Sequence, residues 1–110
     1  MSGSVNIENS RIMLNKEQGL RLTGGIRFKI WNNEIEENKE GVEILSCEAN
    51  LLKNKIKKNR KNGVSIRTVE KILCNVRLVF NIITKNRRNG ILIEGKSNQG
   101  KTISQLFSQI

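Results

Sequence analysis

Apolar and polar residues alternate in the first third of the chain. Between residues 20 and 31 the apolar side chains fall at every second position on either side of Gly24-Gly25. Such alternation indicates half-buried β-strands, and glycines between two such runs are typical of a hairpin turn. A loop over 23–25 pairs Leu22 with Ile26, which keeps the apolar side chains on one face. The sequence therefore predicts an N-terminal β-hairpin.

Helical spacing of apolar residues begins at Val42. Leu45, Ala49 and Leu52 share one side of a helix that is expected to end near Asn62-Gly63. Ser65 is a good N-cap for a second helix. The apolar face of that helix comprises Ile66, Val69, Ile72, Leu73, Val76, Phe80 and Ile83. The pattern predicts two amphipathic helices, with Cys47 and Cys74 as buried thiols within them.

The C-terminal third predicts a strand followed by a short helix. Residues 90–94 form a short apolar run of strand type, and residues 103–110 place apolar side chains on one side of a helix. The expected fold class is therefore α+β, with an incomplete α/β NTPase core at its C-terminal end. We expect a polar and acidic hairpin region at 1–40 and a basic helical region at 41–110. Trp31 and the phenylalanines are expected in the core.

Composition adds a strong positive charge to this picture. The chain of 110 residues carries 20 Lys and Arg against 10 Glu, and fourteen of the basic residues lie after residue 50. A polyanion is the partner that this charge favours, and we expect a nucleic acid. The candidate contacts are Lys53, Lys55, Lys57, Lys58, Arg60, Lys61, Arg87 and Arg88.

Several functional classes are excluded by what the chain lacks. It has no histidine, which removes Ser-His and Cys-His catalysis, and two cysteines alone cannot form a four-ligand zinc site. The longest apolar runs are far shorter than a membrane-spanning helix, and no leader segment is recognisable, so we expect a nuclear or cytoplasmic protein that is neither secreted nor membrane-bound.

Residues 95–102 match the Walker A pattern G-x-x-x-x-G-K-[ST]. In such a loop the backbone N–H groups curl around phosphate oxygens, a lysine reaches the β- and γ-phosphates, and the following hydroxyl binds Mg²⁺. Lys101 and Thr102 take these two places, so ATP and Mg²⁺ are the expected cofactors, with Thr102 as the metal ligand. The candidate nucleotide-binding residues are Gly95, Lys96, Ser97, Asn98, Gln99, Gly100, Lys101 and Thr102.

The segment 76–102 resembles the superfamily-3 helicases of parvoviruses and papillomaviruses. In that family a helix carrying a Phe leads to a basic turn that ends in Asn, then to a strand and a loop with Asn-x-Gly-Lys-Ser/Thr. Arg87-Arg88-Asn89 and residues 98–102 occupy these places, whereas Lys96-Ser97 replaces the commoner Pro-Pro or Pro-Ser pair. The resemblance implies an ATP-binding part of a ring-forming viral replication helicase.

Hydrolysis is not expected of this chain alone. A P-loop ATPase needs an acidic residue on a neighbouring strand, and no Asp or Glu follows Thr102. The leading hypothesis is thus the nucleotide-binding first part of a helicase domain. Two alternatives stay open: a small basic protein that binds RNA or single-stranded DNA and matches Walker A by chance, and an interaction module that forms a homodimer.

Overall fold

In the computed structural model every regular element of the described residues is a β-strand. The structure describes residues 3–24, 27–45, 47–68 and 75–95. The strands in chain order are β1 (Ser4–Glu8), β2 (Arg11–Met13), β3 (Gln18–Thr23), β4 (Arg27–Trp31), β5 (Glu34–Glu36), β6 (Glu40–Leu45), β7 (Glu48–Leu52), β8 (Lys55–Lys57), β9 (Val64–Thr68), β10 (Asn75–Val79), β11 (Ile82–Thr84) and β12 (Ile91–Gly95).

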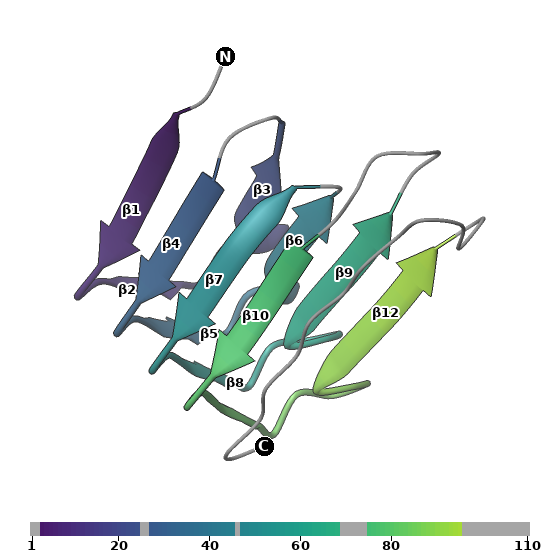
Figure 1. Ribbon diagram of the computed structural model, residues 1–110. Helices are drawn as coiled ribbons and strands as arrows, with labels where there is room; N and C mark the ends of the chain where they lie inside the picture. The colour runs from purple at the N-terminus through teal and green to yellow at the C-terminus, as the bar shows by residue number, and fades with distance from the viewer. Residues whose placement is uncertain (1–2, 25–26, 46, 69–74, 96–110) are drawn as a thin grey trace.

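The strands form three parallel sheets that wind into a solenoid (Figure 1). Sheet A has the order β1-β4-β7-β10, sheet B the order β2-β5-β8-β11, and sheet C the order β3-β6-β9-β12. Each turn contributes one strand to each sheet, so the described residues form four turns. Neighbouring turns are about 4.8 Å apart, the usual spacing of hydrogen-bonded strands.

The core consists of columns of apolar side chains that run along the solenoid axis. Alternate residues of each strand point inward, and parallel register stacks equivalent residues from turn to turn. In sheet A, for example, Ile30 pairs with Leu51 and Leu51 with Leu78, and all three are buried. In sheet B the column contains Ile35, Ile56 and Ile83. This stacking replaces the helix packing that the sequence predicts.

An asparagine ladder fills the corner between sheets A and B. The side-chain oxygen of Asn54 accepts hydrogen bonds from the backbone N–H and the Nδ2 of Asn33, at 2.9 and 3.0 Å. Asn54 in turn donates through the same two groups to Asn81 Oδ1, at 2.9 and 3.0 Å. Its Nδ2 also donates to the carbonyl of Ile30. The amide side chains therefore satisfy the polar groups that a tight buried corner leaves unpaired.

A second asparagine ladder fills the corner between sheets B and C. Here Asn38 donates to Asn59 Oδ1, and Asn59 donates to Asn86 Oδ1. The chain bends sharply before each ladder position, because the preceding residue has positive φ. These residues are Asn9, Asn32, Lys53 and Phe80 at the first corner and Leu14, Glu37, Lys58 and Lys85 at the second.

Glycines follow the second corner and allow neighbouring turns to approach closely. A Cβ at Gly41 would lie 2.5 Å from the carbonyl oxygen of Gly63, and one at Gly63 would lie 2.8 Å from that of Gly90. Gly19 occupies the equivalent place in the first turn, where a Cβ would lie 2.8 Å from the oxygen of Gly41. Side chains are excluded from this column, which is the reason glycine recurs there.

The length of a turn varies along the chain. Ladder residues at the first corner are separated by 23, 21 and 27 residues, and those at the second corner show the same three separations. The path from the first corner to the second is therefore constant. The variation lies in the rest of the turn, mainly in the connections from sheet C to sheet A, which have three, two and six residues.

The fold differs from the predicted α+β arrangement in two ways. The two helices are absent from the described parts of 42–83, where strands β6 to β11 stand instead. The strand that was to open the incomplete α/β NTPase core is β12, which continues sheet C, and the short helix predicted at 103–110 lies outside the described residues. The strands expected on either side of Gly24-Gly25 exist as β3 and β4, but they do not form a hairpin. β3 pairs with β6, whereas β4 pairs with β1 and β7.

Core placement follows the predictions in part. Cys47 and Phe28 are buried, as expected. Trp31 is only half-buried and lies on the outer side of β4, with Lys29 Nζ 5.2 Å from its ring centroid. Phe80 was expected inside, yet it is 58% exposed, because the chain turns with positive φ at that residue. Cys74 and Phe107 lie outside the described residues.

Candidate functional site

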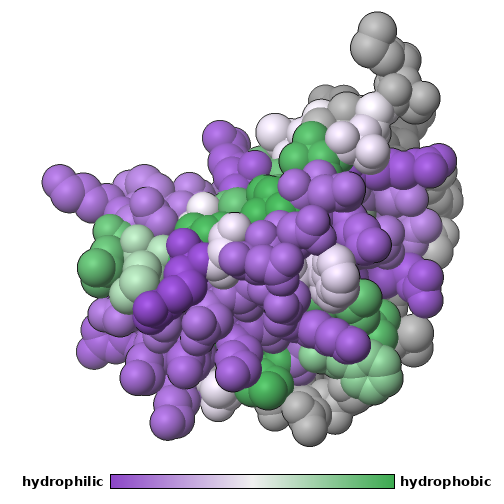
Figure 2. Space-filling view, turned by 90° about the vertical axis from the view of Figure 1, so that its left-hand side faces the viewer, coloured by the Kyte–Doolittle hydropathy of each residue, from purple (hydrophilic) through white to green (hydrophobic). Residues whose placement is uncertain are grey.

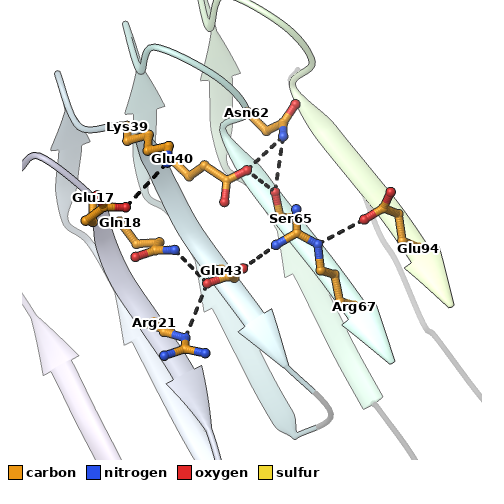
Figure 3. Close-up of polar contacts among 10 residues, drawn as sticks. All are labelled: Glu17, Gln18, Arg21, Lys39, Glu40, Glu43, Asn62, Ser65, Arg67 and Glu94. Carbon is orange, nitrogen blue, oxygen red and sulfur yellow. Dashed lines mark hydrogen bonds and ion pairs between the residues drawn. The ribbon is translucent and has the colours of Figure 1, made fainter. Parts of the chain in front are cut away.

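The outer face of sheet C carries a network of polar side chains that spans all four turns (Figure 3). Glu40, at the start of β6, is 5% exposed and sits near its centre. Its Oε2 accepts hydrogen bonds from Asn62 Nδ2 and from Ser65 Oγ, both at 2.8 Å. Two neutral donors thus compensate the desolvation of this carboxylate, as a buried charge requires.

Glu43 is the second buried carboxylate of this face. It is 6% exposed and contacts Arg21 Nε at 3.4 Å and Gln18 Nε2 at 2.8 Å. Arg67 also donates to it from the next turn. The same arginine donates to Glu94 at 2.9 Å, and this bond, with the surrounding carboxylates, raises the pKa of Arg67 above its ordinary value. The guanidinium therefore stays charged and ties three turns together.

A cleft of about 280 Å³ opens above this network. Its walls combine the carboxylates with cations from the adjoining corner, where Lys39, Lys61 and Arg88 stand on three successive turns. Their backbones are joined in order, since Arg88 N–H donates to Lys61 O and Lys61 N–H donates to Lys39 O. The cleft thus has an acidic floor, whose carboxylates are occupied by internal donors, and a basic rim.

We expect Glu43→Gln to lower the free energy of unfolding by about 1–2 kcal/mol, because the change weakens charged hydrogen bonds to a largely buried acceptor. Urea denaturation measures the loss. Glu48→Gln is the matched control, since Glu48 pairs with Arg27 at 3.5 Å between two well-exposed side chains. The control is expected to cost less than about 0.5 kcal/mol. Equal losses in both variants would contradict a structural role of the network.

The basic rim continues into a cluster of cations at the corner between sheets B and C, which we call the basic corner. It consists of Lys58, Arg60, Lys61, Lys85, Arg87 and Arg88. Although 27 residues separate equivalent positions, stacking brings the two groups onto adjacent turns, as the bond from Arg87 N–H to Asn59 O shows. None of the six forms an ion pair with any residue that the structure describes.

Like charges on adjacent turns repel one another. Four of the cations, Lys58, Lys85, Arg87 and Arg88, are exposed. Arg60 is also exposed, and its Nη2 donates to the backbone oxygen of Lys16 at 2.8 Å, which fixes its guanidinium over the first turns. The corner therefore presents an ordered row of positive charge that a bound anion would neutralise.

The structure separates the cations that the sequence grouped as one run. Lys53 lies at the first corner, and Lys55 and Lys57 lie on β8 in sheet B, where they pair in register with Glu34 and Glu36. Only Lys58, Arg60 and Lys61 of that run reach the basic corner. The prediction that a helix carries this run is wrong. The residues of the run occupy the two corners and strand β8 between them.

The predicted nucleotide loop is described at one residue only. Gly95 ends β12 and pairs with Thr68, while the remaining residues, Lys96 to Thr102, lie outside the described part of the chain. The strand before the loop repeats β3, β6 and β9. ATP and Mg²⁺ stay untested predictions.

Within the described residues, no group of three or more acidic or cysteine side chains could hold a metal ion. The same residues contain no helix that is long and apolar enough to cross a membrane.

Sequence reasoning missed the buried residues of the sheet C network. The sequence pattern places Glu40 in the polar and acidic region 1–40, Glu43 in a helix and Asn62 at the end of that helix. The available signal is their position beside the recurring glycines. In each turn a polar residue precedes a glycine that is followed by an apolar strand, as in Glu40-Gly41 and Asn62-Gly63.

The comparisons with known proteins agree with this architecture. No curated protein and no solved structure matches the chain. A family model described as a right handed beta helix region matches residues 1–105. That match includes the segment that resembles the viral helicases, and the described residues of that segment, 76–95, continue the three sheets of the preceding turns. The interpretation as an ATP-binding helicase segment, with its viral replication role, is therefore wrong. The chain belongs to the right-handed β-helix family.

Proposed function

We propose that this protein is a binding module that holds a linear anionic polymer along its basic corner. The observation that carries the proposal is the stacking of Lys58, Lys61, Lys85 and Arg88, with their neighbouring arginines, on adjacent turns without acidic partners among the described residues. A row of charges with one fixed spacing suits an extended polymer that carries its own charges at regular intervals.

The chemistry of the corner favours an acidic polysaccharide over a single-stranded nucleic acid. Bases bind such proteins largely by stacking on aromatic rings. The basic corner includes no aromatic side chain. Guanidinium and ammonium groups suit the carboxylates and sulfates of an acidic polysaccharide. The buried carboxylates of sheet C have internal donors, which supports binding rather than catalysis.

The test is binding of labelled polygalacturonate by fluorescence anisotropy at several salt concentrations. We expect the affinity to fall steeply with salt, and Arg87→Ala/Arg88→Ala to reduce it by roughly tenfold or more, because cation contacts release counterions. Arg77→Ala is the matched control, since this exposed arginine lies on β10 away from the corner.

The outcomes distinguish the polymers. Neutral dextran is expected to show no binding. Tighter binding of an oligothymidylate than of polygalacturonate would replace the polysaccharide by a nucleic acid as partner. A flat salt response, or equal losses in the double variant and in Arg77→Ala, would contradict the basic corner as the binding surface.

A further inference from the structure

Exposed hydrophobic side chains are few among the described residues. Figure 2, which looks onto the first-turn end, shows hydrophobic atoms within a mainly hydrophilic surface. Three exposed hydrophobic residues of the described part of the chain lie at separate places, namely Val5, Leu14 and Ile93. Two others, Phe80 and Ile82, are 58% and 37% exposed and lie two residues apart where the fourth turn passes the first corner. They form an apolar surface on one outer edge of the solenoid.

Phe80 is held in a conformation that its side chain disfavours. Its φ is 57°, in the left-handed region, which is uncommon for a bulky residue. The equivalent residues of the first two turns are Asn9 and Asn32, a residue type that tolerates positive φ. Because the ring of Phe80 is exposed, burial does not offset this strain. Strained residues gather at functional sites, and the exposed ring is therefore a candidate ligand contact.

Two columns of outward-facing residues run along this edge of the solenoid. One consists of the residues with positive φ at the first corner, and the other of the first residues of the sheet B strands. In turn order the columns are Asn9, Asn32, Lys53 and Phe80, and Arg11, Glu34, Lys55 and Ile82. The members from the first three turns line a cleft of about 300 Å³, and Phe80 and Ile82 continue its two sides at the fourth turn.

The cleft contains polar groups without partners among the described residues. Asn32 Nδ2 donates to Asn9 Oδ1 at 2.7 Å, which leaves Asn32 Oδ1 and Asn9 Nδ2 available to a ligand. The carboxylate of the lining, Glu34, is paired with an arginine at 3.6 Å. Lys53 and Lys55 are exposed and form no ion pair with a described residue. Two ammonium groups of one turn therefore lack a counterion in the cleft.

These groups together fit a sugar that carries a carboxylate. Ammonium groups bind a carboxylate through charge-assisted hydrogen bonds, and amide groups exchange hydrogen bonds with hydroxyls. An aromatic ring has a negative face, on which the C–H groups of a sugar ring pack. A uronic acid supplies a carboxylate, hydroxyls and a C–H face in every unit.

A nucleic acid strand fits the cleft less well. Its phosphates recur at every unit and bind to cations spaced along a protein surface. Among the described residues of the two columns, the cations without an acidic partner lie on the third turn alone, and the next turn offers Phe80 and Ile82 instead. One anionic group beside an apolar ring face matches this order, whereas a run of phosphates does not.

We propose that the first corner is a second binding site, which takes uronic-acid units of an oligosaccharide. Lys53 and Lys55 hold the carboxylate of one unit, Asn9 and Asn32 bind its hydroxyls, and the ring of Phe80 packs against the neighbouring unit. The site lies on the other side of sheet B from the basic corner. It shares the ligand chemistry of the proposed function but none of its residues, so either proposal can fail alone.

Isothermal titration calorimetry with trigalacturonate tests the site. The full chain carrying Arg87→Ala/Arg88→Ala is the parent, because this change weakens the basic corner and leaves the first corner intact. We expect the parent to bind, and Phe80→Asn to lower its affinity about fivefold or more through loss of the ring contact. Lys53→Gln should lower it about tenfold through loss of a charged hydrogen bond. Asparagine suits positive φ, so Phe80→Asn should unfold at no lower temperature than the parent.

Leu14→Asn is the matched control, since Leu14 is also an exposed apolar residue with positive φ but lies at the second corner. Its affinity should equal that of the parent. A parent without binding, undiminished affinity in Phe80→Asn or in Lys53→Gln, or an equal loss in Leu14→Asn would overturn the proposal. Tighter binding of a thymidine dinucleotide than of trigalacturonate would also overturn it and make a nucleic acid the ligand of this cleft.

Discussion

Asn54→Ala is expected to lower the free energy of unfolding by about 4 kcal/mol. The side chain accepts two hydrogen bonds from Asn33 and donates to Ile30 O and Asn81 Oδ1, all between 2.9 and 3.0 Å. Alanine leaves these buried groups without their partners, and each such loss costs about 1–3 kcal/mol. Urea denaturation followed by circular dichroism gives the difference.

Asn50→Ala is the control for this substitution. Asn50 lies on β7 a few residues earlier, points outward, and makes no side-chain hydrogen bond to a described residue. Its replacement is expected to change stability by no more than about 0.5 kcal/mol. A loss below about 1 kcal/mol for Asn54→Ala would mean that the corner closes without its ladder, and the account of the fold given above would fail.

Gly41→Ala is expected to cost about 3 kcal/mol. A Cβ at this position would lie 2.5 Å from Gly63 O, 2.7 Å from Ile56 Cγ2 and 3.0 Å from Asn59 Nδ2, so the backbone of the next turn has to move. The cost is steric, since Gly41 does not have the positive φ that alanine avoids. Thermal unfolding measures it as a lowered midpoint.

Gly24→Ala separates this steric cost from backbone strain. Gly24 has φ of +100°, but a Cβ there meets nothing within 4 Å. We expect a loss of about 1 kcal/mol, from conformation alone. If Gly24→Ala were as harmful as Gly41→Ala, close approach between turns would not explain the recurring glycines.

The strands were predictable where apolar and polar residues alternate along the sequence, whereas the pairing of those strands was not. The alternation from Leu20 to Ile30 correctly predicts β3 and β4, and the apolar run at 90–94 correctly predicts β12. A strand pattern does not say which strand it pairs with. The hairpin is wrong because Gly24-Gly25 connects two sheets rather than two neighbouring strands.

The helices were predicted from spacing that the corners create. Leu45, Ala49, Leu52 and Ile56 are three or four residues apart, although they lie on three successive strands, β6, β7 and β8. The informative signal is the repeat, in which two asparagines five residues apart precede a glycine and an apolar strand. It occurs at Asn33 and Asn38, at Asn54 and Asn59, and at Asn81 and Asn86. Self-comparison of the sequence would have detected it, despite unequal turn lengths.

The candidate site was predictable in its residues and unpredictable in its arrangement. Charge alone selects Lys58, Arg60, Arg87 and Arg88 as cations for a polyanion. Only the solenoid places the two groups on adjacent turns, and only it assigns Lys55 and Lys57 to a different face. The acidic floor of sheet C could not be inferred, since burial of Glu40 and Glu43 depends on partners from other turns.

The path between the two corners has a constant length, whereas the connections that leave sheet C vary in length. This difference determines where such a protein can accept insertions as it diverges. The five residues from one corner ladder to the next cannot change in number without misaligning both, whereas the connections that leave sheet C already differ, from two residues between β6 and β7 to six between β9 and β10. Extra segments can therefore be inserted on that one side, turn by turn, while the columns beneath keep their alignment.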